Sequence, residues 1–283
     1  MTAGPLPGPA LLFCPADRPD RYAKALAAAD GVIIDLEDGV GAAAKDTARA
    51  ALLATPADPA RVIVRVNAAG TAEHPADLAA VRQAGYRLVM LPKAETRAEL
   101  DALAGPWQVV ALAETPAGIL NAAAIAAAPN VAAMMWGAED LLAAIGGRSS
   151  RHPDGRYRDV ARHARSAVLL AAAAAGKPAV DSVYVNIPDL DGLAAEAQDA
   201  AASGFAVKAC IHPSQVPVVR AAFQPDEAQV AWARRVLDAV RASAGRRGSG
   251  ALKVDGQMID APLIRQAEAV LAASAKQSRK AVR

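Results

Sequence analysis

Short apolar runs, many rich in β-branched residues, alternate with longer alanine-rich stretches along most of the chain. The short runs are typical of buried parallel strands, and the alanine-rich stretches have helical character. Eight strands are therefore predicted, over residues 11–14, 32–35, 62–66, 88–91, 109–113, 131–136, 180–185 and 207–211. Helices are predicted between them, over residues 21–29, 42–53, 76–84, 97–103, 119–127, 160–175 and 193–202. A helix in each connection favours a closed (β/α)8 TIM barrel over an open sheet.

The pattern changes after the last predicted strand. A helix is predicted over residues 226–242, and the stretch "AGRRGSG", residues 244–250, has the composition of a flexible linker. Asp255-Gly256 then predicts the turn of a hairpin. A final helix is predicted over residues 261–275, with Asp260 well placed as its N-cap.

The length of 283 residues suits one barrel and a small appendage. We therefore expect a catalytic barrel domain over residues 1–243. The remaining segment, residues 244–283, is expected to act as a lid formed by the hairpin and the last helix.

Composition and charge indicate small-molecule partners. The 31 basic and 29 acidic residues leave a net charge of +2, too balanced for general affinity for nucleic acid or an anionic membrane. No apolar run has the length of a membrane span, and the first residues lack the features of a signal peptide, so a cytoplasmic protein is expected. Cys14 and Cys210 have neither metal-site nor disulfide-framework spacing and are expected to be reduced thiols in the core.

Charged and polar residues follow the predicted strands at their carboxyl ends. In a barrel of this kind these ends open onto one mouth, where active sites lie. One such residue could be chance, but charges on this many neighbouring strands indicate a site. In chain order they are Asp17 and Arg18, Glu37 and Asp38, Arg65 and Asn67, Lys93, Glu114, Glu139 and Asp140, and His212.

Two of these carboxylates suggest a metal site. Asp140 has two interpretations, because it could cap the helix that follows it or bind a cation. Glu114 ends the neighbouring strand, where no helix pattern explains an acid. With Glu37 and Asp38 behind them, the pair suits a hard divalent cation such as Mg²⁺ that keeps several waters. The sequence has no Cys/His cluster of the kind that holds structural zinc.

Three cationic side chains have open alternatives. Arg65 interrupts an apolar strand and needs an anionic partner, which could be Glu37 or Asp38 within the protein or the carboxylate of a substrate. Lys93 could form a Schiff base, but nearby acids favour ion pairing. His212 could be a general base or a hydrogen-bonded loop residue. Dinucleotide, NTP and serine-hydrolase motifs are absent from the sequence.

Several motifs together resemble one family. In chain order these are "LFCPADRPDRYAKA", "VIIDLEDGV", "VRVN", "MLPKAE", "ALAETPAGILN", "MMWGAEDL", "DSVYVNIPDLDGLAAEAQDAAASGF", "CIHPSQV" and "GQMIDAPLIRQAE". They are similar to the citrate lyase β-subunit-like branch of the HpcH/HpaI aldolase superfamily, over roughly residues 11–270. The resemblance implies a TIM barrel with a C-terminal extension, Mg²⁺, and a coenzyme A thioester as substrate. Asn186 and Ala16 depart from the family's usual aspartate and glycine.

The resemblance also implies roles for individual residues. Glu114 and Asp140 would be the metal ligands, with Glu37 and Asp38 supporting the metal's water shell. Arg65 would contact the oxygens of a 2-oxo acid, which would also lie against Glu114 and the backbone of Gly137 and Ala138. Coenzyme A would bind at the barrel mouth to Phe13, Arg18, Lys24, Ile211 and His212. Asp260 would act from a neighbouring subunit, which implies a homo-oligomer, a trimer or a hexamer.

The implied activity is that of a Mg²⁺-dependent carbon–carbon lyase of the retro-Claisen or aldol type. Such an enzyme cleaves a 3-hydroxyacyl-CoA, for example malyl- or citramalyl-CoA, to an acyl-CoA and a 2-oxo acid. Arg65 would add positive charge at the oxo-acid oxygen, and Asp260 would return a proton to the acyl-CoA enolate. One alternative is a citrate lyase β subunit that acts on a citryl thioester of an acyl-carrier partner. Another is a catalytically idle barrel that serves as a binding or scaffold subunit.

Overall fold

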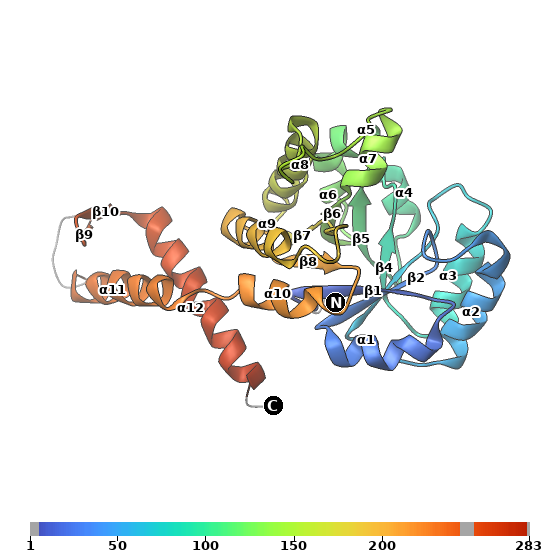
Figure 1. Cartoon of the computed structure of the whole chain (residues 1–283), viewed down its shortest axis with the longest axis horizontal. Coiled ribbons are helices and arrows are strands. Elements are labelled where there is room, and N and C mark those ends of the chain that lie inside the picture. Colours follow the sequence, from blue (N-terminus) through green and yellow to red (C-terminus); the bar gives the residue numbers. More distant parts are fainter. Residues whose placement is uncertain (1–5, 244–251, 282–283) are drawn as a thin grey trace. The chain divides into compact units, whose positions relative to one another are not determined.

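Eight parallel strands close into a barrel, as the sequence predicts (Figure 1). The computed structural model describes residues 6–243 and 252–281. The barrel strands are β1 (Ala10–Pro15), β2 (Gly31–Asp35), β3 (Val62–Arg65), β4 (Leu88–Leu91), β5 (Gln108–Ala113), β6 (Val131–Trp136), β7 (Ala179–Asp181) and β8 (Val207–Cys210). Each strand pairs with the next one along the chain, and β8 pairs with β1 to complete the ring. The fold is therefore a TIM barrel.

Helices connect successive strands and surround the barrel (Figure 1). The α-helices are α1 (Tyr22–Ala28), α2 (Lys45–Ala54), α3 (His74–Gln83), α4 (Arg97–Ala102), α5 (Pro116–Leu120), α6 (Ala122–Ala126), α7 (Ala138–Ala144), α8 (Asp159–Ala174), α9 (Leu190–Ser203) and α10 (Gln215–Ala222). Two short 3₁₀ helices, η1 (Pro19–Arg21) and η2 (Ala42–Ala44), precede α1 and α2. No helix in these described parts of the chain is long and apolar enough to cross a membrane.

Three elements differ from their predictions. The single helix predicted over residues 119–127 is divided into α5 and α6 at Asn121, whose side-chain amide donates to the Glu95 carbonyl at 2.9 Å. The strand predicted to reach residue 185 ends at Asp181. Helix α10 is not predicted because its sequence contains Pro217, which is tolerated here because it lies in the first turn, where backbone N–H groups have no helical partner.

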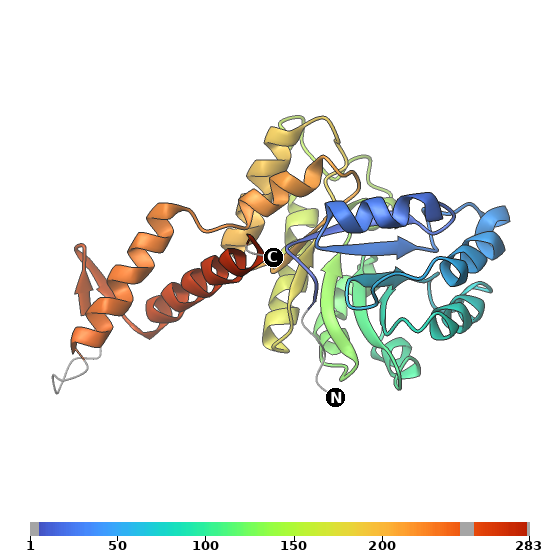
Figure 2. The same ribbon diagram turned by 90° about the horizontal axis from the view of Figure 1, so that it is seen from below.

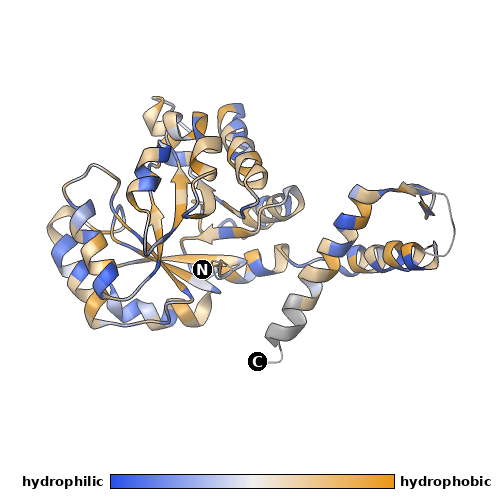
Figure 3. Ribbon diagram, turned by 180° about the vertical axis from the view of Figure 1, so that it is seen from behind, coloured by the Kyte–Doolittle hydropathy of each residue, from blue (hydrophilic) through white to orange (hydrophobic). Residues whose placement is uncertain are grey.

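Apolar side chains from all eight strands fill the barrel. Alternate residues of a strand point to opposite faces, so every second residue faces the interior. Figure 3 colours the strands mainly as hydrophobic, and the interior cluster comprises Leu11, Ile33, Ile63, Met90, Val110, Leu112, Ala133, Met135, Val180, Val207 and Ala209. The same period of two extends this interior face toward the carboxyl ends, at Phe13, Asp35, Arg65, Glu114 and Gly137. The apolar core therefore leads directly into a charged mouth.

The chain divides into two compact units, Met1–Arg220 and Ala221–Arg283. The second contains α11 (Glu227–Ser243), the hairpin strands β9 (Leu252–Val254) and β10 (Gln257–Ile259), and α12 (Ala261–Ala281). Figure 2 shows the hairpin beside α11, and α11 packs against α12 around a small core. Because α11 packs against α12, the two compact units divide before α11, at residues 220 and 221. The sequence predicts the boundary after α11, at residue 243. The predicted linker over residues 244–250 lies outside the described residues, and the role as a lid stays a prediction.

The hairpin turn has the predicted residues. Asp255 and Gly256 both have positive φ angles, 51° and 83°, as a two-residue turn of the I′ type requires. Asp255 also accepts a hydrogen bond from Arg235 Nε at 2.8 Å, which ties the turn to α11. Asp260 precedes α12, and its Oδ1 lies 3.5 Å from the Leu263 N–H, the outer limit of a capping bond.

Candidate active site at the barrel mouth

Arg65 is the centre of an ion-pair cluster at the barrel mouth. It is the last residue of β3 and lies opposite Asp35, the last residue of β2, in the strand ladder. Its Nε and Nη2 donate to the two Asp35 carboxylate oxygens at 2.7 Å each, and Nη1 lies 2.9 Å from Glu37 Oε2. Burial by itself would lower the pKa of Arg65, but the bidentate bond with Asp35 outweighs it and raises this pKa. Arg65 is therefore a fixed, permanently charged group.

The partners of Arg65 are predicted only in part from the sequence. The ion pair with Glu37 is confirmed. The alternative with Asp38 is wrong, because the Asp38 side chain is 60% exposed and pairs with Lys93 instead. The bidentate partner Asp35 was missed. Its signal was present, since Asp35 ends one predicted strand and Arg65 is the last residue but one of the next, and the ends of neighbouring parallel strands lie at the same level.

Lys93 connects the acidic residues of the mouth. Its backbone is in the left-handed region, with φ 52°, which costs about 1–2 kcal/mol for a residue with a Cβ. In this conformation its N–H donates to Glu114 Oε1 at 3.1 Å. Its ammonium lies 2.5 Å from Glu37 Oε1 and 3.6 Å from a carboxylate oxygen of both Asp38 and Asp140.

These contacts confirm the ion-pairing interpretation of Lys93. Burial would lower its pKa, but the hydrogen bond to Glu37 outweighs burial and raises it. A nucleophilic lysine needs the opposite shift, because only the neutral amine attacks a carbonyl. The Schiff-base interpretation is therefore not supported.

Glu114 and Asp140 lie at the ends of adjacent strands, as predicted. Glu114 directly follows β5 and is 3% exposed, whereas the Asp140 side chain, beyond β6, is 40% exposed. Burial and then the negative charges of Asp140 and Glu37 raise the pKa of Glu114 to about 8. Lys93 and Arg65 offset these effects only in part. An excess of carboxylate charge in a buried place favours binding of a cation.

Gly137 makes room for Glu114. A Cβ at residue 137 would lie 2.6 Å from Glu114 Oε2 and 2.8 Å from the Glu114 Cβ, both too short for real contacts. The Glu114 side chain consequently packs directly against the backbone where β6 passes into α7. Ala138, the first residue of α7, is buried at the same junction. Glu114, Gly137 and Ala138 are thus brought together.

The helix-cap interpretation of Asp140 is wrong. Helix α7 begins at Ala138, so Asp140 is its third residue, and no side chain caps the helix at Gly137. The neighbouring acid Glu139 is exposed and accepts a hydrogen bond from Ser150 Oγ at 2.7 Å. Of the two adjacent acids, Asp140 belongs to the cluster around Lys93.

A buried lysine that the sequence did not suggest supports the segment carrying Glu37. Lys45 Nζ donates to the Leu36 and Glu37 carbonyls, at 2.6 and 2.7 Å, and to Asn67 Oδ1 at 2.8 Å. Burial raises the pKa of the Glu37 carboxyl, although Arg65 and Lys93 oppose this shift. Glu37 Oε2 is buried and accepts no hydrogen bond from the described residues, although Arg65 Nη1 lies 2.9 Å away, so it retains capacity to accept one.

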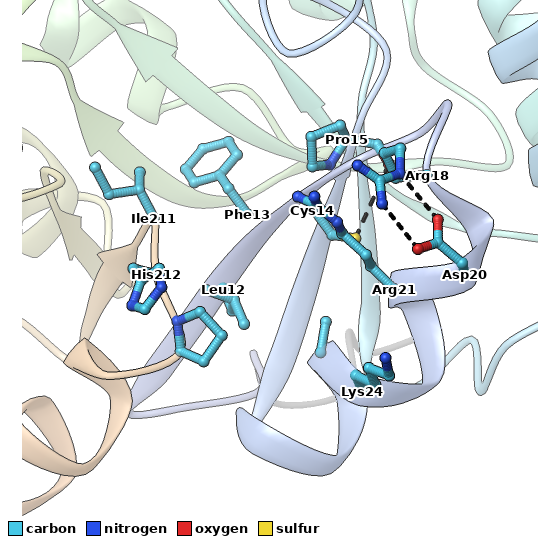
Figure 4. Close-up of a pocket in the computed structure, with 12 residues that line it drawn as sticks. Leu12, Phe13, Cys14, Pro15, Arg18, Asp20, Arg21, Lys24, Ile211 and His212 are labelled. Atoms are coloured by element: carbon cyan, nitrogen blue, oxygen red, sulfur yellow. Dashed lines mark hydrogen bonds and ion pairs between the residues drawn. The ribbon is translucent and has the colours of Figure 1, made fainter. Parts of the chain in front are cut away.

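Figure 4 shows a cavity of about 610 Å³ that is lined in part by Phe13, whose ring contacts Arg65 of the charged cluster. All five residues predicted to bind coenzyme A line it, namely Phe13, Arg18, Lys24, Ile211 and His212. Arg21, which was not predicted, lines it as well. Three cationic side chains on one wall suit an anionic ligand.

Two residues define the character of the cavity wall. The Arg65 guanidinium lies 5.0 Å from the centre of the Phe13 ring, so Phe13 belongs both to the cavity and to the charged cluster. His212 is exposed, and its Nδ1 contacts Ser214 Oγ at 2.8 Å, which favours the loop interpretation over a general base. Cys14 lines the cavity too, and burial raises the pKa of its thiol to about 11. Both cysteines are buried and free, as predicted.

A second charged cluster lies on the outer side of β7 and β8, away from the barrel interior. Lys208 is fully buried and donates to Asp181 Oδ2, the Ser182 carbonyl and Glu196 Oε1 at 2.7–3.0 Å. Asp181 also accepts from Trp136 Nε1 and Arg165 Nε. Every charge has a partner, as a buried charge requires, so this cluster joins strands to helices.

A closed (β/α)8 barrel with a charged mouth and an adjoining cavity has the architecture of an enzyme. The chain belongs to the HpcH/HpaI aldolase/citrate lyase family, whose profile matches residues 10–213. A citrate lyase subunit beta-like protein of Mycobacterium tuberculosis is 56% identical over 264 residues, which cover 93% of this chain and 94% of the relative. The human mitochondrial citramalyl-CoA lyase is 31% identical over 292 residues, covering 93% and 84% of the two chains.

Comparison with a solved structure also places the fold of this chain in the same family. The crystal structure of protein CitE from Mycobacterium tuberculosis in complex with magnesium, acetoacetate and coenzyme A matches with a TM-score of 0.90 and 55% identity. The match covers 95% of this chain and 98% of that one. The predicted family and fold are therefore both confirmed.

Proposed function

We propose that the chain is a Mg²⁺-dependent carbon–carbon lyase that cleaves a 3-hydroxyacyl-CoA, such as malyl- or citramalyl-CoA, into an acyl-CoA and a 2-oxo acid. The observation that carries this proposal is the pairing of Glu114 and Asp140 beside Arg65 at one mouth, next to a cationic cavity of about 610 Å³. The similarity to CitE in complex with magnesium, acetoacetate and coenzyme A supports the choice of cofactor and substrate class.

The residues at the mouth fit a magnesium ion. Glu114 and Asp140 supply the hard carboxylate oxygens that Mg²⁺ prefers, and the spare acceptor Glu37 Oε2 suits a hydrogen bond from metal-bound water. Among the described residues, no three His, Cys, Asp or Glu side chains are spaced to hold a metal ion together. Two protein ligands would leave positions for water and substrate, as is usual for Mg²⁺. When bound, magnesium would supply Lewis-acid stabilisation of negative charge on the oxo-acid oxygens.

Arg65 would bind and orient the oxo acid. Asp35 engages two of the five N–H groups of its guanidinium, and the Nη1 side faces Glu37, so further N–H groups are available to a planar carboxylate or keto oxygen. Because Asp35 and Phe13 fix the plane of the guanidinium, its remaining donors have a set direction. Such preorganised donors stabilise charge that develops during carbon–carbon cleavage.

Arg18, Arg21 and Lys24 would bind the phosphates of coenzyme A, whose acyl end would reach the mouth past Phe13. Arg18 pairs with Asp20 through two hydrogen bonds at 2.9 and 3.0 Å, and this exposed pair would exchange for phosphate contacts. We also propose that Asp260 of a neighbouring subunit returns the proton to the acyl-CoA enolate in a trimer or hexamer. We propose that the enzyme acts in the cytoplasm.

The decisive experiment incubates the purified chain with a panel of 3-hydroxyacyl-CoA thioesters, with and without Mg²⁺, and measures acyl-CoA and 2-oxo acid separately. Asp140→Ala and Glu114→Ala are expected to abolish Mg²⁺-dependent cleavage, whereas Glu139→Ala, a change at the neighbouring exposed acid, retains it. Full Mg²⁺-dependent cleavage by either of the first two variants would refute the assignment of the metal ligands.

A second candidate is a citrate lyase β subunit that acts on a citryl thioester of an acyl-carrier partner. It is favoured by the 56% identity to a protein described as citrate lyase subunit beta-like. Cleavage of a free CoA thioester by the purified single chain separates the two, because a carrier-dependent subunit would be inactive alone. A catalytically idle barrel would show neither activity nor binding of Mg²⁺ and oxo acid in calorimetry.

A further inference from the structure

We infer that Lys93 is a positioning residue that holds Glu37 off the metal site and thereby limits the protein ligands to Glu114 and Asp140. This inference rests on the proposed function of the mouth. It assigns a task to a side chain that the cleavage scheme does not itself use.

The first step concerns Glu37. It is a buried carboxylate, and the one Lys93 ammonium reaches both Glu37 Oε1, at 2.5 Å, and Asp140 Oδ1, at 3.6 Å, so Glu37 lies close enough to compete as a third ligand for a cation bound at Asp140. Both its oxygens face cations instead: Oε1 lies 2.5 Å from Lys93 Nζ, and Oε2 lies 2.9 Å from Arg65 Nη1. Arg65 uses Nε and Nη2 for Asp35 and contacts Glu37 as an ion pair through Nη1, whereas Lys93 makes the one hydrogen bond from a side chain to the Glu37 carboxylate among the described residues.

The second step concerns Asp140. The Lys93 ammonium lies 3.6 Å from Asp140 Oδ1, so it would share this ligand with a cation bound there. Its positive charge opposes a divalent ion at the same carboxylate. Lys93 thus acts twice on metal binding, by restraining a competing ligand and by like-charge repulsion. Both effects weaken the hold on the metal and keep coordination positions open for a chelating 2-oxo acid.

The backbone of Lys93 has a separate task. Its N–H donates to Glu114 from a left-handed conformation, and this bond does not involve the side chain. A change to another unbranched residue therefore removes the ammonium and leaves the bond to Glu114 in place. Lys93→Met and Lys93→Gln are suitable neutral variants, and Lys93→Arg is the control that keeps the charge.

The test measures metal affinity directly, by titrating Mn²⁺ and following the free ion by electron paramagnetic resonance. Removal of a unit charge from beside a divalent cation changes its affinity by about tenfold even in a water-like dielectric. We expect Lys93→Met and Lys93→Gln to bind Mn²⁺ about tenfold more tightly than wild type, and Lys93→Arg to bind within about threefold. The affinity of the metal-loaded neutral variants for pyruvate is expected to fall, because Glu37 takes a position that the oxo acid needs.

Glu37→Gln alone is the reference, because independent charge effects add and would leave the gain from Lys93→Met intact in that background. Compared with this reference, the double variant Lys93→Met/Glu37→Gln separates the restraint on Glu37 from a simple loss of charge. It is expected to lose most of the gain in Mn²⁺ affinity and to recover pyruvate affinity. Unchanged or weaker Mn²⁺ binding in both neutral variants, with native circular dichroism, would overturn the inference. The proposed function fails separately, if wild type binds no Mn²⁺ or if Asp140→Ala binds it as well as wild type.

Discussion

The close packing of Glu114 against Gly137 makes Gly137→Ala a sharp test of the metal site. The added Cβ would lie 2.6 Å from Glu114 Oε2, and an ordinary contact begins at 3.4 Å, so the carboxylate must retreat by about 0.8 Å. The Glu114 side chain cannot simply rotate away, because the new Cβ also lies 2.8 Å from the Glu114 Cβ, next to the backbone. The strain must therefore be shared by the ends of β5 and β6.

The expected cost of Gly137→Ala follows from this geometry. Overpacking of this kind destabilises a protein by about 1–3 kcal/mol, and a displacement near 1 Å in a catalytic site lowers the rate by about 100-fold. We expect kcat/KM for 3-hydroxyacyl-CoA cleavage to fall by about that factor and Mg²⁺ affinity to fall with it, as measured by steady-state kinetics and calorimetry. Gly41→Ala is the control, because its Cβ meets nothing within 4 Å. Native Mg²⁺ affinity in Gly137→Ala would show that Glu114 is not a ligand.

Three further results are expected. Arg65→Lys keeps the charge but loses the bidentate bond to Asp35. In the condensation direction, the KM for the oxo acid should therefore rise about tenfold or more, with the KM for the acyl-CoA little changed. Equal rises in both KM values would contradict the role of Arg65. Glu114 is protonated in the metal-free protein up to about pH 8, so Mg²⁺ binding between pH 5 and 8 should release a proton and tighten as pH rises, which calorimetry in buffers of different ionisation enthalpy detects. The same sign means that metal-free protein loses stability as pH rises from about 4.5 to about 8, because only the folded state keeps the Glu114 proton in this range. Absence of proton release would contradict the raised pKa. Lys208→Met leaves the buried Asp181 without one of its cationic partners and should lower the free energy of unfolding, measured in urea, by about 3–5 kcal/mol. The Mg²⁺ affinity should stay native. A loss of Mg²⁺ affinity in this variant would show that the metal site depends on this cluster.

The sequence predicts the fold well because the barrel depends on repeated local signals. Each strand is a short apolar run between helical stretches, and eight such runs have one common closed arrangement. The errors occur where the signal is not periodic. The break at Asn121 depends on a side-chain bond to Glu95 from another loop, and α10 is concealed by a proline that only its position in the first turn permits.

The site follows a similar rule. Strand ends are visible in the sequence, so Glu114, Asp140 and Arg65 are found and lie at one mouth. Partners within the site depend on strand register and on which rotamer a long side chain adopts, and these are tertiary features. For this reason Lys45 was missed, and Asp35 was not paired with Arg65 although both lie near visible strand ends. The left-handed backbone of Lys93 has no sequence signal, since glycine or asparagine usually occupies that region.

The division of the mouth between two arcs of the barrel has a consequence for how such enzymes diverge. Strands β2–β6 deliver the charged cluster, whereas β1 and the segment after β8 line the cavity, and Phe13 is the residue that touches both. Each strand of the ring bonds only to its two neighbours. β1 itself pairs with β2 at Pro15 and Asp35, but it does so through the backbone, so side-chain substitutions on the cavity arc can accumulate while the β2–β3 ladder still holds Asp35 opposite Arg65. A lineage can inherit its bond-breaking chemistry intact and exchange one thioester for another through changes confined to the other arc.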